Sequence, residues 1–356
     1  MKKIIFLLIV LFPLSIKAIE TSATSGILMD TDSNRILYSK NINKQRSVAS
    51  ISKIMTAIIA IESNKLDDMV IIGDEIEKAY GSGIYIKKGE KISLRDLIYG
   101  LMLRSGNDAA LAIANYVGGS VDKFVSMMND KAKQLKMKNT IFNNPSGLDE
   151  DKGNYSTAYD MAILSSYAIQ NDEFKKIVGT KNYSLDTSSN VYKWKNKNKL
   201  LFSYKYCTGG KTGYTEIAKR TLVTFATKDD VNLVVVTLND GNDWFDHEAL
   251  FEYGFSNYSK YRILSKGNIN IYDEKYYKNY NLYIKNDFEY LLLSEETNSV
   301  LLKYNLEKYK KVKKNMKIGY VDVFIGDKKV HTENIFLSKK KNVKKSFIDK
   351  IKELIK

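Results

Sequence analysis

Cysteine and histidine are scarce in this sequence of 356 residues, which holds one cysteine, Cys207, and two histidines, His247 and His331. A single cysteine leaves no partner for an internal disulfide. No cluster of cysteine and histidine exists, so we predict neither a metal site nor a cofactor. A Ser-His-Asp hydrolase is also disfavoured, because neither histidine accompanies a nucleophile-elbow motif.

Long apolar runs are equally scarce, and the only one lies at the beginning of the chain. Two lysines precede an apolar run from Ile4 to Ile16, and Ala18 follows it. This is the layout of a secretory signal peptide, and 13 residues fall short of the roughly 20 that span a bilayer. We predict a signal peptide at residues 1–18 and an exported protein at the outer face of the cytoplasmic membrane. An uncleaved anchor is the alternative.

The net charge of +15 is concentrated in the last third of the chain. Residues 260–356 contain 23 lysines and arginines against 12 aspartates and glutamates. A basic region of an exported protein suits anionic lipid or an anionic wall polymer. We predict no nucleic-acid partner, because the sequence shows no nucleic-acid-binding motif.

Hydrophobic periodicity predicts an α+β region at residues 19–258, with a helical cluster placed within a strand framework. Two short strands joined by a polar turn predict a hairpin at 25–40. Two β-rich runs, 220–227 and 231–238, are separated by a short turn and predict adjacent strands of a largely antiparallel sheet. Helices are predicted at 46–64, 93–103 with Ser93 as N-cap, 107–117, 121–135, 156–169 with Ser156 or Thr157 as cap, and 246–255.

The hydrophobic pattern of the sequence changes near residue 259. Residues 259–338 alternate with a period of two and turn at Gly326-Asp327, which predicts a small all-β domain. The end of the chain, 339–356, has helical periodicity with lysines on its polar face. We predict a basic amphipathic helix that binds an anionic membrane surface. A helix docked on its own domain is the competing interpretation.

One lysine of the first predicted helix stands out, because it lies in an otherwise apolar run. In "SVASISKIMTAIIAIE", Lys53 follows Ser50 by three residues, a spacing that lets two side chains meet on one helix face. Burial lowers the pKa of a lysine, which can then take the proton of a serine hydroxyl. Alone, the pattern favours a lysine that extends to solvent, because Ser-x-x-Lys occurs three times in the chain.

Two further patterns change that balance. Ser105-Gly106-Asn107 offers a hydroxyl that can relay protons and an amide that can bind a substrate carbonyl. Lys211-Thr212-Gly213 occurs once and joins a lysine and a hydroxyl, which can grip a carboxylate, to a small residue. A small residue there lets a substrate backbone lie against the edge of a strand.

In the order Ser-x-x-Lys, Ser-x-Asn, Lys-Thr-Gly, these motifs form the set found in β-lactamases and penicillin-binding proteins. Their surroundings are "GEKISLRDLIYGLMLRSGNDAALAIANYVGGS", "NNPSGLDEDKGNYSTAYDMA" and "GGKTGYTEIAKRTLV". Over residues 25–255 the sequence resembles the low-molecular-mass D-alanyl-D-alanine carboxypeptidases. The resemblance implies a β-lactamase/transpeptidase-like catalytic domain, and it extends to the C-terminal β domain and terminal helix.

The same resemblance implies the catalytic roles. Ser50 is the nucleophile toward the D-Ala–D-Ala peptide bond, and Lys53 is the base for acylation. Ser105 relays the proton of the leaving group, and Asn107 orients the substrate amide. The substrate is then a peptidoglycan stem peptide that ends in D-Ala-D-Ala, and β-lactam antibiotics become covalent inhibitors.

On the binding side, the resemblance assigns the terminal carboxylate to Lys211 and Thr212, next to Gly213. The resemblance also implies that the backbone N–H groups of Ser50 and Tyr214 form the oxyanion hole. Ser50 lies near the N-terminus of the predicted helix, where the helix dipole favours developing negative charge.

The segment "NDWFDH", 242–247, resembles a branch of the family from spore-forming bacteria. This resemblance points to wall remodelling in sporulation.

Three positions depart from the family pattern without touching the motifs: Val48 replaces a frequent proline, Ser146 a frequent histidine and Lys219 a common glycine.

Two alternative functions stay open. A class A β-lactamase needs a deacylating glutamate with asparagine three or four residues later; of Glu150 and Glu173, only Glu150 has one, in a loop that matches the carboxypeptidases. A non-catalytic penicillin-binding sensor or wall-binding protein is the other.

Overall fold

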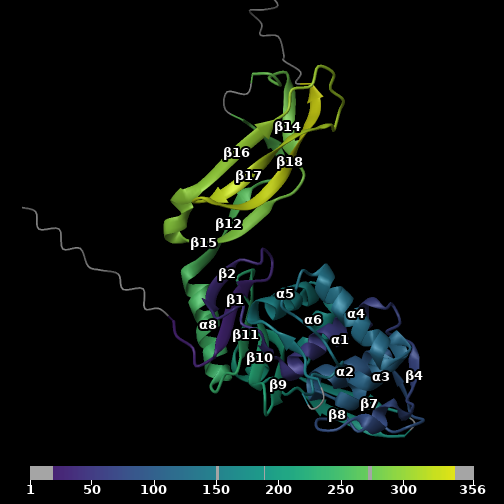
Figure 1. Cartoon of the computed structure of the whole chain (residues 1–356). Helices are drawn as coiled ribbons and strands as arrows, with labels where there is room; N and C mark the ends of the chain where they lie inside the picture. The colour runs from purple at the N-terminus through teal and green to yellow at the C-terminus, as the bar shows by residue number, and fades with distance from the viewer. Residues whose placement is uncertain (1–18, 150–151, 188, 272–274, 341–356) are drawn as a thin grey trace, which may run out of the picture. The chain divides into compact units, whose positions relative to one another are not determined.

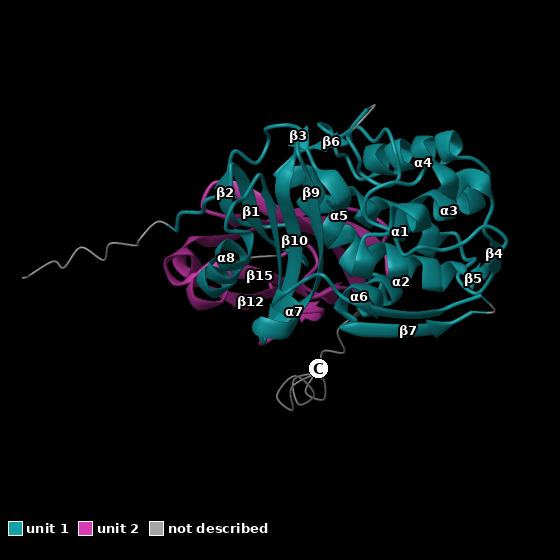
Figure 2. Cartoon of the chain, turned by 90° about the horizontal axis from the view of Figure 1, so that it is seen from below, with its two compact units in different colours: residues 1–228, 232–254 teal, residues 229–231, 255–356 magenta. Residues whose placement is uncertain are grey.

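The structure is a computed structural model that describes residues 19–149, 152–187, 189–271 and 275–340 (Figure 1). Two compact units are distinguished by colour in Figure 2. Unit 1 runs to Lys228 and includes Asn232–Gly254, whereas unit 2 holds Asp229–Val231 and the chain from Phe255 onward. The predicted signal peptide lies outside the described residues. So does the predicted terminal helix, apart from its first two residues, which end a strand.

Unit 1 is built on a five-stranded sheet with the order β2-β1-β11-β10-β9. The strands are β1 (Ser25–Asp30), β2 (Ile36–Lys40), β9 (Cys207–Thr215), β10 (Lys219–Lys228) and β11 (Val231–Leu238). β1 pairs antiparallel with β2 and β11, and β9 pairs antiparallel with β10. The predicted hairpin and the predicted neighbours β10 and β11 are confirmed. β9, which carries the Lys-Thr-Gly motif, is an edge strand.

The two faces of this sheet are covered by different helices. Alternate side chains of a strand point to opposite faces, so Ile27 and Met29 join the main core while Leu28 points the other way. On that second face lies α8 (Asp243–Asn257), where a Cβ at Gly254 would lie 2.7 Å from Leu233. The sheet is therefore a middle layer between α8 and a cluster of helices (Figure 2).

The helical cluster forms where the periodicity predicted it. Its helices are α1 (Lys53–Glu62), α2 (Leu94–Arg104), α3 (Asn107–Gly118), α4 (Val121–Gln134), α5 (Ala158–Ile169), α6 (Asp172–Gly179) and α7 (Leu200–Ser203). Ser93 and Thr157 accept hydrogen bonds from backbone N–H groups in the first turns of α2 and α5, as expected of N-caps. α6, α7 and three short strand pairs were not predicted: β3 (Arg46–Ser47) with β6 (Tyr155–Ser156), β4 (Met69–Ile71) with β5 (Lys91–Ser93), and β7 (Asn182–Asp186) with β8 (Val191–Lys195).

Unit 2 is an all-β domain with its own core. Its strands are β12 (Tyr258–Leu264), β13 (Gly267–Ile269), β14 (Tyr280–Ile284), β15 (Phe288–Leu293), β16 (Val300–Leu306), β17 (Lys317–Ile325) and β18 (Lys328–Lys340). β12 pairs with β15, and the others form a sheet with the order β13-β14-β18-β17-β16. The predicted turn at Gly326-Asp327 joins β17 to β18. Within the described ranges, no helix is long and apolar enough to cross a membrane.

Candidate active site

Ser50 lies in a short 3-10 turn, Ala49–Ser52, which leads directly into α1. The predicted regular helix therefore begins only at Lys53. Ala49 has a φ of 49°, a left-handed conformation that a residue with a side chain rarely adopts. Such strain persists only where the surrounding structure enforces it, and it collects at functional sites.

Lys53 meets Ser50 in a buried environment. Its Nζ lies 3.0 Å from Ser50 Oγ, 2.7 Å from Asn107 Oδ1 and 2.5 Å from the carbonyl oxygen of Ser146. The residue is 0% exposed. Burial lowers the pKa of Lys53 to about 7, and the positive charge of Lys197 acts in the same direction. A sizeable neutral fraction near pH 7 can therefore accept a proton from Ser50.

The second and third motifs contact each other next to the Ser50–Lys53 pair. Ser105 ends α2 in a left-handed conformation, and Asn107 begins α3. Lys211 Nζ donates to Ser105 Oγ at 3.1 Å and to the carbonyl oxygen of Thr212 at 2.6 Å. Burial lowers the pKa of Lys211 well below its ordinary value. Ser50, Ser105 and Thr212, which are far apart in sequence, thus line one cavity.

β9 passes directly beside the Ser50 turn, and Gly213 makes that approach feasible. A Cβ at Gly213 would lie 3.0 Å from the backbone nitrogen of Ser50 and 2.4 Å from Thr221 Oγ1. Only a residue without a side chain fits there unless the strand moves. The backbone of Ser50 and the edge of β9 are therefore held together, as an oxyanion hole formed by Ser50 and Tyr214 requires.

A cavity of about 420 Å³ opens at Ser50. It is lined by Ser50, Ser82, Ser105, Lys197, Thr212, Gly213, Tyr214, Arg220, Asp243 and Trp244. Lys53 and Lys211 are not among these residues, because both lie beneath the cavity surface. A peptide that lies along the edge of β9 would have Ser50 within the cavity that receives it.

The loop at 143–149 contacts the site, although none of the three motifs lies in it. Asn144 Oδ1 accepts hydrogen bonds from the backbone N–H of Ser146 at 3.1 Å and of Gly147 at 2.6 Å, and from Ser146 Oγ at 3.0 Å. Gly147 has a φ of +83°, and a Cβ on it would lie 2.0 Å from the carbonyl oxygen of Ala49. Asn144 therefore shapes a loop that presses on the nucleophile turn and directs the Ser146 carbonyl at Lys53.

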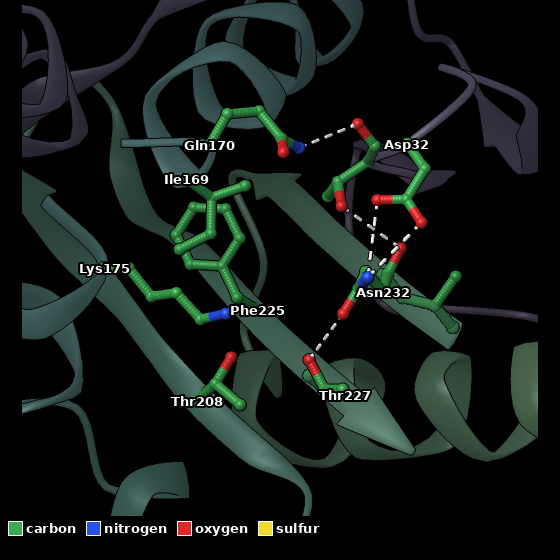
Figure 3. A pocket seen from close by; sticks show the side chains of 11 residues that line it. Asp32, Ile169, Gln170, Lys175, Thr208, Phe225, Thr227 and Asn232 are labelled. Atoms are coloured by element: carbon green, nitrogen blue, oxygen red, sulfur yellow. Dashed lines mark hydrogen bonds between the residues drawn. The ribbon is translucent and has the colours of Figure 1, made fainter. Parts of the chain in front are cut away.

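A smaller cavity of about 50 Å³ lies at the other end of the β9–β10 pair and holds no comparable chemistry (Figure 3). Several of its polar side chains bond to one another or to the backbone: Thr227 Oγ1 donates to Asn232 Oδ1 at 2.9 Å, and Gln170 Nε2 donates to the Thr31 carbonyl at 3.3 Å. In the parts of the chain that the structure describes, no acidic, cysteine or histidine cluster is arranged to hold a metal ion.

The fold and the buried Ser-Lys pair define an active-site serine hydrolase in which lysine occupies the place that histidine has in a triad. Comparison with known proteins identifies the family. Residues 13–242 match the family described as D-alanyl-D-alanine carboxypeptidase, peptidase S11. The chain belongs to this family, as its motifs predicted.

Relatives in several bacteria carry the same description. The chain is 32% identical to the D-alanyl-D-alanine carboxypeptidase DacD of Escherichia coli over 340 residues, which covers 89% of this chain and 86% of that protein. It is 36% identical to DacF of Bacillus subtilis over 220 residues, 60% of this chain. The matched region spans only 56% of the length of the Bacillus protein.

Solved structures confirm the fold class. Penicillin binding protein 5 from Haemophilus influenzae matches with a TM-score of 0.76 and 28% identity, covering 90% of this chain and 98% of that one. Penicillin binding protein 6B from Escherichia coli matches with a TM-score of 0.71 and 29% identity, covering 90% and 97%. The predicted α+β class, with a β-lactamase/transpeptidase-like unit and a C-terminal β domain, is confirmed.

Proposed function

We propose that this protein is a serine-type D-alanyl-D-alanine carboxypeptidase that removes the terminal D-alanine from peptidoglycan stem peptides. The observation that carries the proposal is the 3.0 Å separation of Lys53 Nζ from Ser50 Oγ, at a cavity bordered by the edge of β9. Neutral Lys53 takes the proton of Ser50 as its oxygen attacks the carbonyl of the penultimate D-alanine. The oxyanion is stabilised by the N–H groups of Ser50 and Tyr214.

Collapse of the intermediate breaks the peptide bond and leaves an ester on Ser50. The leaving nitrogen takes a proton through Ser105, which Lys211 supports from beneath, and D-alanine departs. Asn107 orients the amide of the bound peptide. Water then attacks the ester, returns the proton to Ser50 and releases the shortened peptide. A β-lactam mimics the terminal dipeptide and acylates Ser50 by the same route.

The decisive experiment is turnover of diacetyl-L-Lys-D-Ala-D-Ala by the purified mature protein, with D-alanine as the measured product. Stoichiometric labelling by penicillin without any D-alanine release would instead favour the sensor. Rapid penicillin hydrolysis without peptide turnover would favour the β-lactamase. Against that last reading, Glu173 lies on α6 in an ion pair with Arg95 and does not line the cavity, and Glu150 lies outside the described residues.

The location of the enzyme belongs to the same proposal. The signal-peptide layout of residues 1–18 supports export, and the lysine-rich periodicity of 339–356 supports peripheral attachment to an anionic membrane surface. The enzyme would then act at the outer face of the cytoplasmic membrane, where its substrate is assembled into wall. The resemblance of residues 242–247 to a branch from spore formers motivates a role in sporulation wall remodelling.

A further inference from the structure

The positive charge of the catalytic cavity comes from residues outside the three motifs. Lys211 is 1% exposed, and its nitrogen is bonded to Ser105 and to the carbonyl oxygen of Thr212. The cations that line the cavity are Lys197 and Arg220. A substrate that ends in a carboxylate therefore meets one of these two side chains at the cavity surface.

Strand register places Arg220 opposite Tyr214 and diagonally across from Thr212. Arg220 is paired with Tyr214, and Thr212 is paired with Leu222, in the antiparallel pair of β9 and β10. Residues paired across two strands, and residues two apart along one strand, share a face of the sheet. Arg220, Tyr214 and Thr212 therefore project from the same face, and all three line the cavity that contains Ser50.

The guanidinium of Arg220 is held in one orientation. Nε donates to Asp243 Oδ2 at 3.1 Å, and Nη2 donates to Asp243 Oδ1. Asp243 is 3% exposed, so this carboxylate is a fixed support. The Arg220 Cζ also lies 5.6 Å from the centre of the Trp244 ring, on which it stacks.

One nitrogen of the guanidinium has no hydrogen-bond partner among the described residues. The bonds to Asp243 use Nε and Nη2, and Nη1 donates to none of the residues that the structure describes. The Arg220 side chain is 42% exposed. Because Arg220 lines the cavity, its guanidinium is suited to bind a carboxylate there through charge-assisted hydrogen bonds.

We propose that Arg220 recognises the α-carboxylate of the terminal D-alanine together with Thr212, and that Asp243 and Trp244 position its guanidinium. The proposal rests on the carboxypeptidase function and names the residue that binds the free C-terminal carboxylate of the substrate. Lys211 supports Ser105 from beneath the cavity, and Arg220 makes the direct contact. The same contact holds the carboxylate of a β-lactam.

The test compares two peptides, diacetyl-L-Lys-D-Ala-D-Ala and its C-terminal carboxamide, at equal chain length. The wild-type enzyme should prefer the carboxylate. In Arg220→Ala, kcat/KM for the carboxylate should fall on the order of 10- to 100-fold, the size of a lost charge-assisted pair, while kcat/KM for the carboxamide holds. Asp243→Asn should lose part of this preference, because the guanidinium keeps its charge and loses its fixed orientation.

Two variants serve as comparisons. Lys219→Ala removes the neighbouring exposed cation of the same hairpin, which lies outside the cavity lining, and should leave both rates unchanged. A preference that survives Arg220→Ala, or that disappears in Lys197→Ala instead, would overturn the proposal. Thermal unfolding of each variant separates a folding defect, which would lower both rates together, from a loss of recognition.

A second arm separates this proposal from the proposed function. The rate of covalent acylation is measured with benzylpenicillin and with its methyl ester, which lacks the carboxylate. Arg220→Ala should slow acylation by the acid and not by the ester. Absence of D-alanine release in the wild type would refute the carboxypeptidase activity, and the acylation ratio would still support or refute the role of Arg220.

Discussion

The amino nitrogen of Lys53 lies 3.0 Å from the hydroxyl oxygen of Ser50, and no carboxylate of the described residues hydrogen-bonds to it. Its partners are a hydroxyl, the Asn107 amide oxygen and the Ser146 carbonyl, all of which are neutral. Burial is the main cause that lowers the pKa of this lysine; the charge of Lys197 lowers it further, and the Asp108 carboxylate opposes them only in part. The same feature explains how a hydrolase with two histidines can have a base that works at neutral pH.

The first prediction concerns pH. Lys53 acts as base in its neutral form, so acylation should speed up as pH rises through about 7, the pKa of the buried amine, and should be lost on the acid side. The measurement is the rate of labelling by a fluorescent penicillin from pH 5 to 9. An acylation rate that falls only below about pH 4 to 5 would indicate a carboxylate base instead.

The second prediction uses the neighbouring cation as a probe of that pKa. Lys197 repels the protonated form of Lys53, so Lys197→Ala should raise the pKa of Lys53 and move the acid limb of acylation to higher pH. Lys133→Ala, on the exposed surface of α4, is the matched control and should leave the limb in place. A limb that stays fixed in Lys197→Ala would show that another group titrates.

The third prediction concerns the nucleophile and its base. Ser50→Ala should abolish both D-alanine release and covalent penicillin labelling. Lys53→Met keeps the bulk of the side chain, removes the base, and should slow acylation by about 10²- to 10⁴-fold, the usual contribution of a general base. Labelling that persists in Ser50→Ala would move the nucleophile to another residue.

The catalytic groups were predictable because short motifs encode them, but their supports were not. Ser50 and Lys53 lie three residues apart, a spacing that permits contact on one helix face, and the two later motifs are what favour that contact over a lysine that extends to solvent. Arg220 is different, because its place beside Thr212 follows from the β9–β10 register, which no local pattern of the sequence reveals. The left-handed Ala49 was equally hidden, since an alanine carries no sign of a positive φ.

The loop at 143–149 shows the same limit from another side. Its asparagine, proline and glycine residues predict a turn, but this composition does not indicate which part of the chain the turn packs against. The target is fixed only by tertiary packing, which brings Gly147 against Ala49 and the Ser146 carbonyl against Lys53. The hydrophobic periods of the strands and helices predict the layers of the fold, but they do not predict this contact.

The fourth prediction tests that loop. Asn144→Ala removes the acceptor of three hydrogen bonds from the loop and should cost about 1–3 kcal/mol of stability. Acylation should slow by roughly tenfold, because the Ser146 carbonyl no longer aligns Lys53. Asn139→Ala, at an exposed asparagine, is the control. Wild-type acylation by a destabilised Asn144→Ala would show that the loop supports the fold alone.

The fifth prediction concerns the approach of β9 to Ser50. In Gly213→Ala the added methyl would lie 3.0 Å from the Ser50 nitrogen and 2.4 Å from Thr221 Oγ1, so the strand must move. A displacement of about 1 Å at an active site costs about 100-fold in rate, and we expect a loss of at least that size in both acylation and peptide turnover. Gly241→Ala is the control, because a Cβ there has no atom within 4 Å. Full activity of Gly213→Ala would mean that the oxyanion hole does not depend on this contact.

The location proposal has its own test, and the structure refines where the chain should be cut. Lys340 is still paired with Tyr280 in β18, so the truncation should remove residues 341–356 and leave the strand intact. We expect the truncated mature protein to leave the membrane fraction and to keep peptide turnover, because the catalytic residues lie in unit 1. Phe347→Asp with Ile351→Asp in the full chain should have the same effect, since both residues lie on the apolar face of the predicted helix. Membrane association that survives both changes would assign attachment to another part of the chain, with the uncleaved N-terminal segment as the first place to look.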